Sequence, residues 1–271
     1  MTNIAWAGSL AGLVVLLALV AGVLILRRRT HQLERLLTAT DHKLEQLQRQ
    51  FERFVPADVV ERLTEGPGTY APQRLQVTML FADLRGFTAL CDRLDPAVTV
   101  AILNGYFQHM HEAITQHHGH ITELIGDGLL ALFGALEANP WQGRDSVLAA
   151  LAMRVALERY NAQLRAKGLP ELHFGIGIHS GEVVAGVMGA GELSKFSVTG
   201  DPINVASRVE GLTREHAVDL LITAEVRAAL DARFRLKAMP PTHVKGKREA
   251  IVTYHVEGVV QGATAPARLS A

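Results

Sequence analysis

The strongest constraint on how this chain can fold is an uninterrupted apolar run near its start. From Ile4 to Leu26 no charged residue appears. At a rise of about 1.5 Å per residue, a helix of this length reaches about 35 Å, whereas the hydrocarbon core of a bilayer is about 30 Å thick. We therefore predict a single membrane-spanning helix within residues 1–29.

The charges beside this run predict its orientation. Arg27, Arg28 and Arg29 follow it directly. A cleaved signal peptide is the alternative, but it would carry positive charge before the run and small residues after it. The positive-inside rule places the arginines and the chain beyond them in the cytoplasm. The expected location is the inner (cytoplasmic) membrane, crossed once.

Residues 30–66 are expected to form a helical linker. Core positions there alternate at spacings of four and three residues, with Thr40 as the weak one: Leu33, Leu37, Thr40, Leu44, Leu47, Phe51 and Phe54. Such a repeat is typical of a parallel two-stranded coiled coil, because a 3.5-residue period keeps one stripe against a partner helix. An amphipathic helix packed on its own domain is the alternative. The coiled coil predicts a homodimer.

Composition excludes several classes of function. Lys plus Arg equals Asp plus Glu at 27 each, so no charge excess favours nucleic acid, and we expect no such partner. Cys91 is the only cysteine, which rules out an intrachain disulfide and argues against a zinc site. The histidines between His109 and His120 have no carboxylate at ligand spacing, and we interpret them as a solvated helix end.

The chain after the linker predicts alternating strands and helices, hence one α+β sheet domain over residues 70–257. Expected strands are 75–82, 121–125, 129–133, 172–178, 182–188, 218–222, 233–238, 242–245 and 250–257. Expected helices are 96–118, 142–166, 202–213 and 223–231. The first helix should bury Val100, Leu103, Phe107, Met110 and Ile114. The tail, 258–271, is rich in Gly, Ala and Pro and is expected to be disordered.

Two aspartates stand at exposed ends of apolar segments. Asp83 ends an apolar strand, and Asp127 lies in Gly126-Asp-Gly128, a tight hairpin signal. A carboxylate in such a place is costly unless a cation or hydrogen bonds compensate it. The pair is suited to holding two Mg²⁺ ions for phosphoryl transfer. Spacing alone equally allows two structural turn residues.

Three segments resemble the catalytic domain of class III adenylate and guanylate cyclases, in family order and spacing. They are Val77-Thr-Met-Leu-Phe-Ala-Asp-Leu-Arg-Gly-Phe-Thr88, Ile125-Gly-Asp-Gly-Leu-Leu-Ala-Leu-Phe133 and Gly200-Asp-Pro-Ile-Asn-Val-Ala-Ser-Arg208. Val244-Lys-Gly-Lys247 and Gly175-Ile-Gly-Ile-His-Ser-Gly181 extend the resemblance over residues 70–257. It implies a ferredoxin-like βαββαβ domain, here preceded by the membrane helix and linker, and a head-to-tail homodimer whose two active sites use residues of both subunits.

The resemblance also implies roles for residues of the first two motifs. Asp83, Asp127 and the backbone carbonyl of Leu84 would bind two Mg²⁺ or Mn²⁺ ions per active site. Amides of the following loop would hold the β- and γ-phosphates of a purine nucleoside triphosphate as an anion nest. That loop consists of Arg85, Gly86, Phe87 and Thr88.

From the partner subunit, the resemblance implies that Asn204 orients the ribose, Arg208 stabilises charge on the α-phosphate and Lys245 holds the terminal phosphates. An arginine fork suits phosphate oxygens. One metal would activate the 3′-hydroxyl for attack on the α-phosphate, and both would favour departure of pyrophosphate. The structural alternatives are a surface asparagine, a salt-bridged arginine and a turn lysine.

The choice of base is where this chain departs from the usual adenylate cyclase pattern. Glu123 stands in place of Lys, and Ser197 in place of Asp or Thr. A glutamate can accept hydrogen bonds from guanine, whereas a serine suits either base. The family favours ATP and Glu123 favours GTP, so we expect an adenylate cyclase with a guanylate cyclase as the alternative, unless Glu123 turns away into a salt bridge. Glu182, where some members have a phosphate-binding arginine, is a further departure.

Two other classes compete with this reading. The chain could be a catalytically inactive module that keeps the fold for dimerisation, but its Asp83, Asp127, Asn204 and Arg208 are intact. It could also be a diguanylate cyclase, but the Gly-Gly-Asp/Glu-Glu-Phe hairpin is absent and Ile-Gly-Asp-Gly stands in its place.

Overall fold

The computed structural model describes residues 72–188, 195–243 and 250–260. The chain divides into two compact units, Met1–Thr64 and Glu65–Ala271, and all described residues belong to the second. The predicted membrane helix (1–29) and coiled coil (30–66) lie outside the described residues. Within the described ranges, no helix has both the length and the apolar character needed to cross a bilayer.

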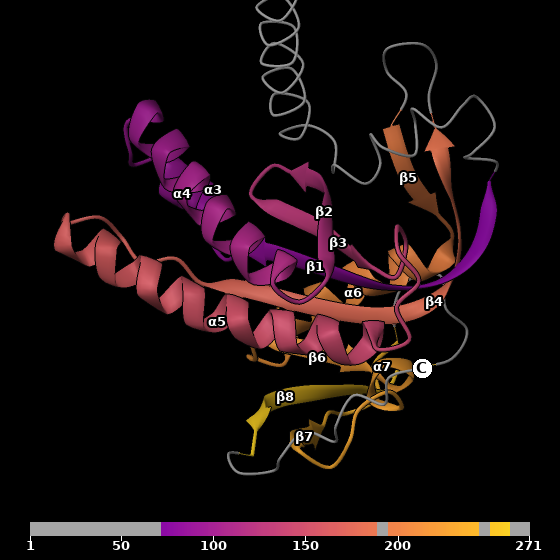
Figure 1. The fold of residues 1–271 in the computed structure, drawn as a ribbon. Coiled ribbons are helices and arrows are strands. Elements are labelled where there is room, and N and C mark those ends of the chain that lie inside the picture. Colours follow the sequence, from indigo (N-terminus) through magenta and orange to yellow (C-terminus); the bar gives the residue numbers. More distant parts are fainter. Residues whose placement is uncertain (1–71, 189–194, 244–249, 261–271) are drawn as a thin grey trace, which may run out of the picture. The chain divides into compact units, whose positions relative to one another are not determined.

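An eight-stranded sheet organises the described unit (Figure 1). Seven strands follow the spatial order β2-β3-β1-β4-β6-β8-β7, while β5 pairs with β4 off this path. Described neighbours are antiparallel except for β4 and β6, which are parallel. The strands are β1 (Gln73–Leu84), β2 (Gly119–Ile125), β3 (Gly128–Phe133), β4 (Phe174–Met188), β5 (Lys195–Thr199), β6 (Leu220–Thr223), β7 (Phe234–Ala238) and β8 (Thr253–Val259).

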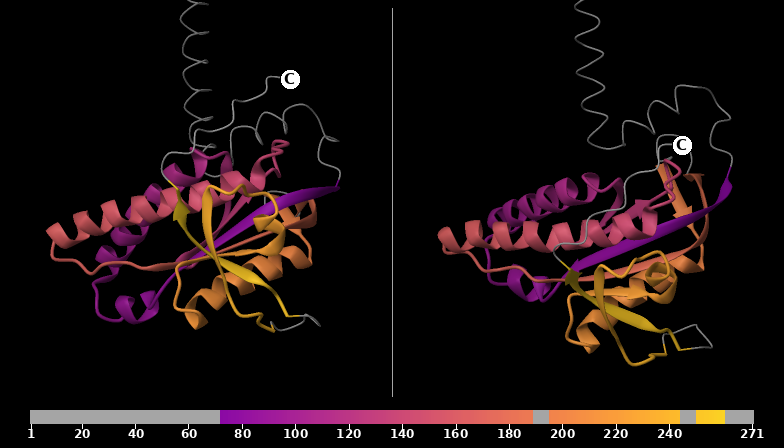
Figure 2. Two further views of the ribbon diagram at one scale, coloured as in Figure 1. Left: turned by 90° about the horizontal axis from the view of Figure 1, so that it is seen from below. Right: turned by 60° about the horizontal axis from the view of Figure 1, so that its bottom comes forward.

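Helices cover both faces of this sheet (Figure 2). They are α3 (Phe87–Cys91), α4 (Pro96–Thr115), α5 (Gln142–Ala166), α6 (Asp201–Glu215) and α7 (Ala224–Arg227). Helices α4 and α5 lie over one face, and α6 lies over the other. The chain order β1-α4-β2-β3-α5-β4, with the strand order β2-β3-β1-β4, is the expected ferredoxin-like βαββαβ arrangement within an α+β fold.

Strand β1 is buried on both faces, and this determines where Asp83 points. Leu80, Ala82 and Leu84 belong to the core beneath α4 and α5, whereas Val77 and Met79 pack on the α6 side. Successive side chains of a strand point to opposite faces. Asp83 therefore projects from the α6 face of the sheet.

Helix α6 packs closely on β4 because a glycine faces it. A Cβ placed on Gly177 would lie 2.6 Å from Glu210 Cα, closer than two carbon atoms can approach. A side chain at Gly177 would therefore push α6 away from the sheet. This close packing holds the residues of α6 over the strands that carry Asp83.

Strand β4 corrects the predicted break at Ser180-Gly181, because it runs without interruption from Phe174 to Met188. Ser180 Oγ hydrogen bonds to Thr78 Oγ1 on β1 at 2.7 Å. Gly181 lies against Pro202, whose Cγ would be 2.7 Å from a Cβ at that position. Both residues thus have partners within a strand, and no turn is needed.

Other boundaries also differ from those expected. Strand β5 was not predicted, and β8 continues to Val259, past the expected end of the domain. In place of the expected strand 242–245, the described residues show an isolated bridge between Thr242 and Ile251. The described parts of the predicted helices 202–213 and 223–231 correspond to α6 and to the shorter α7.

The buried face of α4 is rotated from the one predicted. Val100 is 56% exposed, so its assignment to the core was wrong. Met110 and Ile114 are buried as predicted, whereas Leu103 and Phe107 are only partly buried. The fully covered stripe instead contains Ile102, Tyr106, Met110, Ala113 and Ile114.

Candidate active site

The fold brings Asp83 and Asp127 together. Ala82 pairs with Leu129 between β1 and β3, so Asp83 arrives beside Gly128 at the hairpin that carries Asp127. A Cβ on Gly128 would lie 3.2 Å from Asp83 Oδ1. Burial and then the negative charge of Asp127 raise the pKa of Asp83. The two aspartates therefore act on each other as members of one site.

This pair fits a divalent cation. Two carboxylates that repel each other are stabilised by a cation between them, and carboxylate oxygens are the ligands that Mg²⁺ prefers. The side chain of Leu84 is buried in the α4/α5 core, so only its backbone is available on this side. Among the residues that the structure describes, no group of three or more His, Cys, Asp or Glu side chains is arranged to hold a metal. The fit therefore rests on the two aspartates and backbone oxygen.

An arginine that the sequence analysis did not single out also reaches this pair. Arg214 Nη2, on α6, donates to Asp83 Oδ2 at 2.5 Å. The side chain of Arg214 is 55% exposed and that of Asp83 33% exposed. The arginine opposes the effect of burial and of Asp127 on the pKa of Asp83. The metal-free pair is thus partly neutralised by the chain itself.

A third carboxylate, Glu210, lies behind Asp83. Its Oε1 atom is buried without a hydrogen-bond partner among the described residues. A Cβ on Gly175, the residue paired with Asp83 across β1 and β4, would lie 2.7 Å from this oxygen. Burial and then the charge of Asp83 raise the pKa of Glu210 to about 7, although Arg214 and Arg85 lower it. Glu210 therefore shares the electrostatic environment of the aspartates.

The loop after β1 is tied to the end of α6 through Arg85. Its backbone N–H donates to His173 O at 2.8 Å. Its guanidinium donates to the carbonyl of Thr213 at 3.3 Å and to that of Val218. The amide and side chain of Arg85 thus have protein partners in this structure. Of the phosphate-binding amides predicted here, Arg85 is the one already engaged.

The rest of this loop begins a short helix. Gly86 adopts φ 66°, a left-handed conformation that favours glycine, and α3 starts at Phe87. The Phe87 side chain is buried while Thr88 is exposed. Amides in the first turn of a helix have no partner within the helix. The amides of Gly86, Phe87 and Thr88 are therefore suited to an anion.

Asn204 and Arg208 share one side of α6, four residues apart. Asn204 is exposed, and Arg208 Nη1 is buried without a hydrogen-bond partner among the described residues. Arg208 and Arg214 are six residues apart, which at 100° per residue separates them by about 120° around the helix. Because Arg214 faces Asp83, Arg208 points elsewhere.

A β-bulge determines the direction of Glu123. The register between β2 and β3 shifts between Ile121 and Glu123, so that Thr122 is the extra residue and Glu123 pairs with Leu130. Directly opposite residues share a face, and Leu130 belongs to the α6-side cluster. If Thr122 paired regularly with Leu130, Glu123 would pair with Leu129 on the α4/α5 side. The bulge thus turns Glu123 to the face that carries Asp83.

Three further residues considered in the sequence analysis are Ser197, Lys245 and Glu182. Ser197 pairs with Gly186 on β5, and its neighbours Phe196 and Val198 pack on the α6 side, so Ser197 points the other way. Lys245 lies outside the described residues. Glu182 accepts a hydrogen bond from Arg74 at 2.7 Å, and both side chains are exposed.

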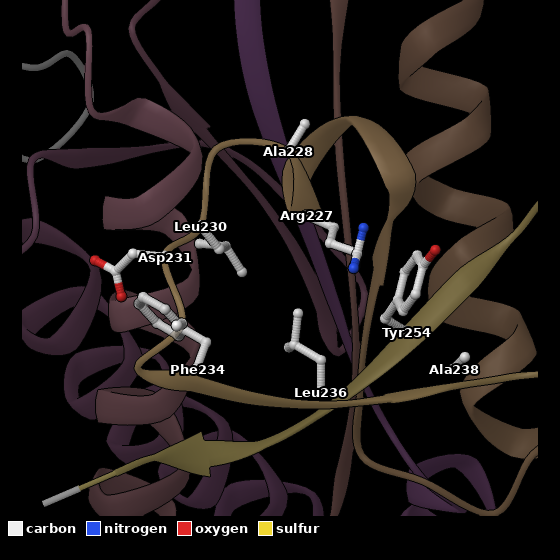
Figure 3. Close-up of a pocket in the computed structure, with 9 residues that line it drawn as sticks. Arg227, Ala228, Leu230, Asp231, Phe234, Leu236, Ala238 and Tyr254 are labelled. Carbon is white, nitrogen blue, oxygen red and sulfur yellow. The ribbon is translucent and has the colours of Figure 1, made fainter.

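A cavity of about 620 Å³ lies elsewhere, between α7, β7 and β8 (Figure 3). Its lining includes Arg227, Leu230, Phe234, Leu236 and Tyr254, and the Arg227 guanidinium lies 4.9 Å from the centre of the Tyr254 ring. None of the predicted site residues lines it. The candidate site is therefore separate from this cavity.

The fold and the paired aspartates define a nucleotidyl cyclase catalytic domain, and comparison with known proteins agrees. Residues 69–258 match the adenylate and guanylate cyclase catalytic domain family. The chain belongs to this family. The prediction of a cyclase catalytic domain is thereby confirmed.

Similar proteins include both kinds of cyclase. Adenylate cyclase of Anabaena cylindrica is 36% identical over 228 residues, which cover 80% of this chain and 44% of that protein. Adenylate cyclase 1 of Rhizobium meliloti (strain 1021) is 33% identical over 213 residues, which cover 78% and 32%. The crystal structure of the guanylyl cyclase Cya2 has a TM-score of 0.66 at 34% identity and covers 70% of this chain and 95% of that one. This chain spans less than half the length of these two curated relatives.

Proposed function

We propose that this chain is an adenylate cyclase that converts ATP to cyclic AMP and pyrophosphate. The observation that carries the proposal is the pairing of Asp83 with Asp127, whose charge acts on Asp83, in a chain of the cyclase family. The two adenylate cyclase relatives support ATP as the substrate. In this reaction the 3′-oxygen bonds to the α-phosphorus, the α–β phosphoanhydride bond breaks, and the 3′-hydroxyl loses its proton.

The directions of the side chains on α6 support a head-to-tail homodimer. Arg208 and Asn204 lie on a different side of that helix from Arg214, so they serve the aspartates of a second chain. Leu124 and Ile125 support this arrangement because they are 56% and 53% exposed beside the Asp127 hairpin. Adjacent exposed apolar side chains favour a protein partner. Such a dimer contains two equivalent sites.

Each residue then has a definite task. The amides of Gly86, Phe87 and Thr88 bind the β- and γ-phosphates. The partner subunit contributes its own copies of three residues. Asn204 orients the ribose, and Arg208 donates to oxygens of the α-phosphate as charge develops there. Lys245 holds the terminal phosphates.

Asp83, Asp127 and the carbonyl of Leu84 would hold two Mg²⁺ or Mn²⁺ ions. Such ions, when bound, neutralise the triphosphate and favour the departure of pyrophosphate. The role of the aspartates is to hold two carboxylates close together, which the chain achieves through the β1–β3 register, while Arg214 offsets part of their negative charge.

A guanylate cyclase is the second candidate, and Glu123 favours it. The bulge at Thr122 turns this carboxylate to the α6 face, where it can accept hydrogen bonds from guanine. The structural similarity to the guanylyl cyclase Cya2 supports this alternative.

We also propose that residues 1–29 anchor the enzyme in the inner membrane and that residues 30–66 form a dimeric coiled coil, with the catalytic domain in the cytoplasm. The apolar run, the three arginines and the heptad repeat support this. Deletion of residues 1–29 should move the protein from the membrane to the soluble fraction. Deletion through residue 54 should weaken dimerisation, so that activity falls on dilution. If both forms fractionate and dimerise like the full chain, the anchor and coiled coil are wrong.

Product identification tests the central proposal. The purified full chain is incubated with Mn²⁺ and either ATP or GTP, and the products are identified by mass spectrometry. Cyclic AMP supports the first candidate and cyclic GMP the second. Asp83→Asn is the matched control because it removes one charge and almost no volume. A folded protein that makes neither product would be an inactive family member.

A further inference from the structure

The contact between Arg214 and Asp83 has to change when a cation binds. Arg214 Nη2 donates to Asp83 Oδ2 at 2.5 Å, on a carboxylate that would be a metal ligand. A guanidinium and a divalent cation repel each other and compete for the same oxygen. The arginine is 55% exposed, and exposed ion pairs are weak, so this contact is easily released.

Glu210 is a second acceptor on the same helix as this arginine. It lies four residues before Arg214 on α6, and residues at this spacing are neighbours on a helix surface. Its Oε1 atom is buried and has no hydrogen-bond partner in the described part of the chain. Because Oε1 packs over Gly175, the residue opposite Asp83, both acceptors lie on one face of adjacent strands. A buried carboxylate oxygen without a donor is costly unless a donor becomes available.

We propose that Arg214 exchanges acceptors, from Asp83 in the metal-free enzyme to Glu210 in the metal-bound enzyme. Both are then positioning residues that control the availability of Asp83. The inference rests on the proposed function only in that Asp83 binds the metal.

The exchange keeps the charges of the cluster balanced in both states. Without metal, Arg214 offsets the repulsion between the carboxylates of Asp83 and Asp127. With metal, that repulsion is neutralised, and Arg214 becomes the surplus positive charge. Glu210, whose Oε1 has no hydrogen-bond partner among the described residues, then accepts the arginine.

A double-mutant cycle with a binding readout tests this exchange. The full chain is titrated with Mn²⁺ in the presence of 3′-deoxy-ATP or 3′-deoxy-GTP, which lack the attacking hydroxyl, and free Mn²⁺ is followed by electron paramagnetic resonance. Arg214→Gln should tighten Mn²⁺ binding about fivefold, the scale of an exposed ion pair. Glu210→Gln alone should weaken Mn²⁺ binding about fivefold. In the Arg214→Gln background, the same substitution should weaken Mn²⁺ binding by less than about twofold.

Matched variants separate exchange from simple charge effects. Glu215→Gln removes a negative charge from an exposed position on the same helix and should change Mn²⁺ affinity by less than about twofold. Arg214→Lys keeps the charge and should stay close to wild type. Equal effects of Glu210→Gln in both backgrounds, or an unchanged affinity in Arg214→Gln, would overturn the exchange.

A further control distinguishes the failure of this inference from failure of the proposed function. Asp83→Asn should abolish Mn²⁺ binding. If it does so while the cycle is additive, only the exchange is wrong. If Asp83→Asn binds Mn²⁺ like wild type, Asp83 is not a ligand and both proposals fail.

Discussion

Asp83 and Gly128 lie against each other where β1 meets the β2–β3 hairpin, and a Cβ on Gly128 would come within 3.2 Å of Asp83 Oδ1. The absence of a side chain at Gly128 lets the hairpin approach Asp83 closely, and burial together with the charge of Asp127 raises the pKa of Asp83. Asp83 and Asp127 are far apart in sequence, and backbone pairing between β1 and β3 holds them close together.

Removal of either aspartate should abolish cyclase activity without unfolding the domain. Asp83→Ala and Asp127→Ala each take away a carboxylate on which cation binding depends, and such losses in metal enzymes reach several kcal/mol. We expect less than about 1% of wild-type turnover, or a loss of about 2.7 kcal/mol or more in transition-state stabilisation. Product formation with Mn²⁺ is the measurement, and circular dichroism checks the fold. Activity of more than a few per cent would contradict the assignment.

Mixed dimers should recover part of this activity. In a dimer of one Asp83→Ala chain and one Asn204→Ala chain, one site carries both changes and the other carries neither. Co-expressed chains with two different tags, purified through both, should show up to about half the activity of wild type. A pure heterodimer without activity would mean that Asn204 serves the aspartates of its own chain.

Glu123 should be the main discriminator between bases. A carboxylate facing adenine lacks a donor, whereas guanine supplies two, and a mismatched hydrogen-bonding edge costs about 1–3 kcal/mol, or roughly ten- to a hundredfold in selectivity. Glu123→Lys combined with Ser197→Asp should therefore shift the ratio of kcat/KM toward ATP. Glu123→Lys alone shows whether Ser197 contributes from the other side of β5. An unchanged ratio would show that residue 123 does not face the base.

Glu210 should make the metal-free enzyme less stable as pH rises. Its pKa is about 7 in the fold and close to the ordinary glutamate value of 4.5 when unfolded, so between these values the unfolded state loses a proton that the folded state keeps. The free energy of unfolding therefore falls between pH 4.5 and 7 and stays lower above pH 7.

Glu210→Gln removes this penalty. With EDTA present, the variant should exceed wild type by about 1–3 kcal/mol at pH 8 and by little at pH 4.5. Thermal unfolding at both values is the measurement, and Glu215→Gln is the control for loss of a negative charge from α6. A stability difference independent of pH would mean that Glu210 is ionised in the fold throughout this range.

Sequence patterns predicted the site residues that have a local signal. They did not predict the residues that join the site only through tertiary contacts. Asp83 and Asp127 could be predicted because each follows a local signal, the end of an apolar run and a Gly-Asp-Gly turn. Arg214 meets Asp83 from 131 residues away, and no local pattern encodes that distance. The available hint was the i, i+4 spacing of Glu210 and Arg214, which makes these opposite charges neighbours on the helix surface.

The errors in the fold have similar causes. Ser180-Gly181 has the composition of a turn, but its partners Thr78 and Pro202 come from other elements and hold it in β4. Helix α4 carries apolar residues on more than one side, so Val100 fitted a helical stripe as well as Ile102 does. Packing against α5, which hydrogen bonds through Tyr160 Oη to Ile102 O at 2.9 Å, selects the stripe that is buried.

The extra residue at Thr122 also bears on how cyclases of this kind can diverge. Strand β2 is at the end of the sheet, paired on one side only with β3, and Glu123 projects to the α6 face rather than into the α4/α5 core. Exchanges at position 123 therefore leave the packing beneath α4 and α5 untouched. Loss of one codon at position 122 would also leave Glu123 opposite Leu130, because Ile121 pairs with Ala131, the neighbour of Leu130 on β3. Point substitutions at position 123 are therefore open to selection on the nucleotide used, without a change in the buried core.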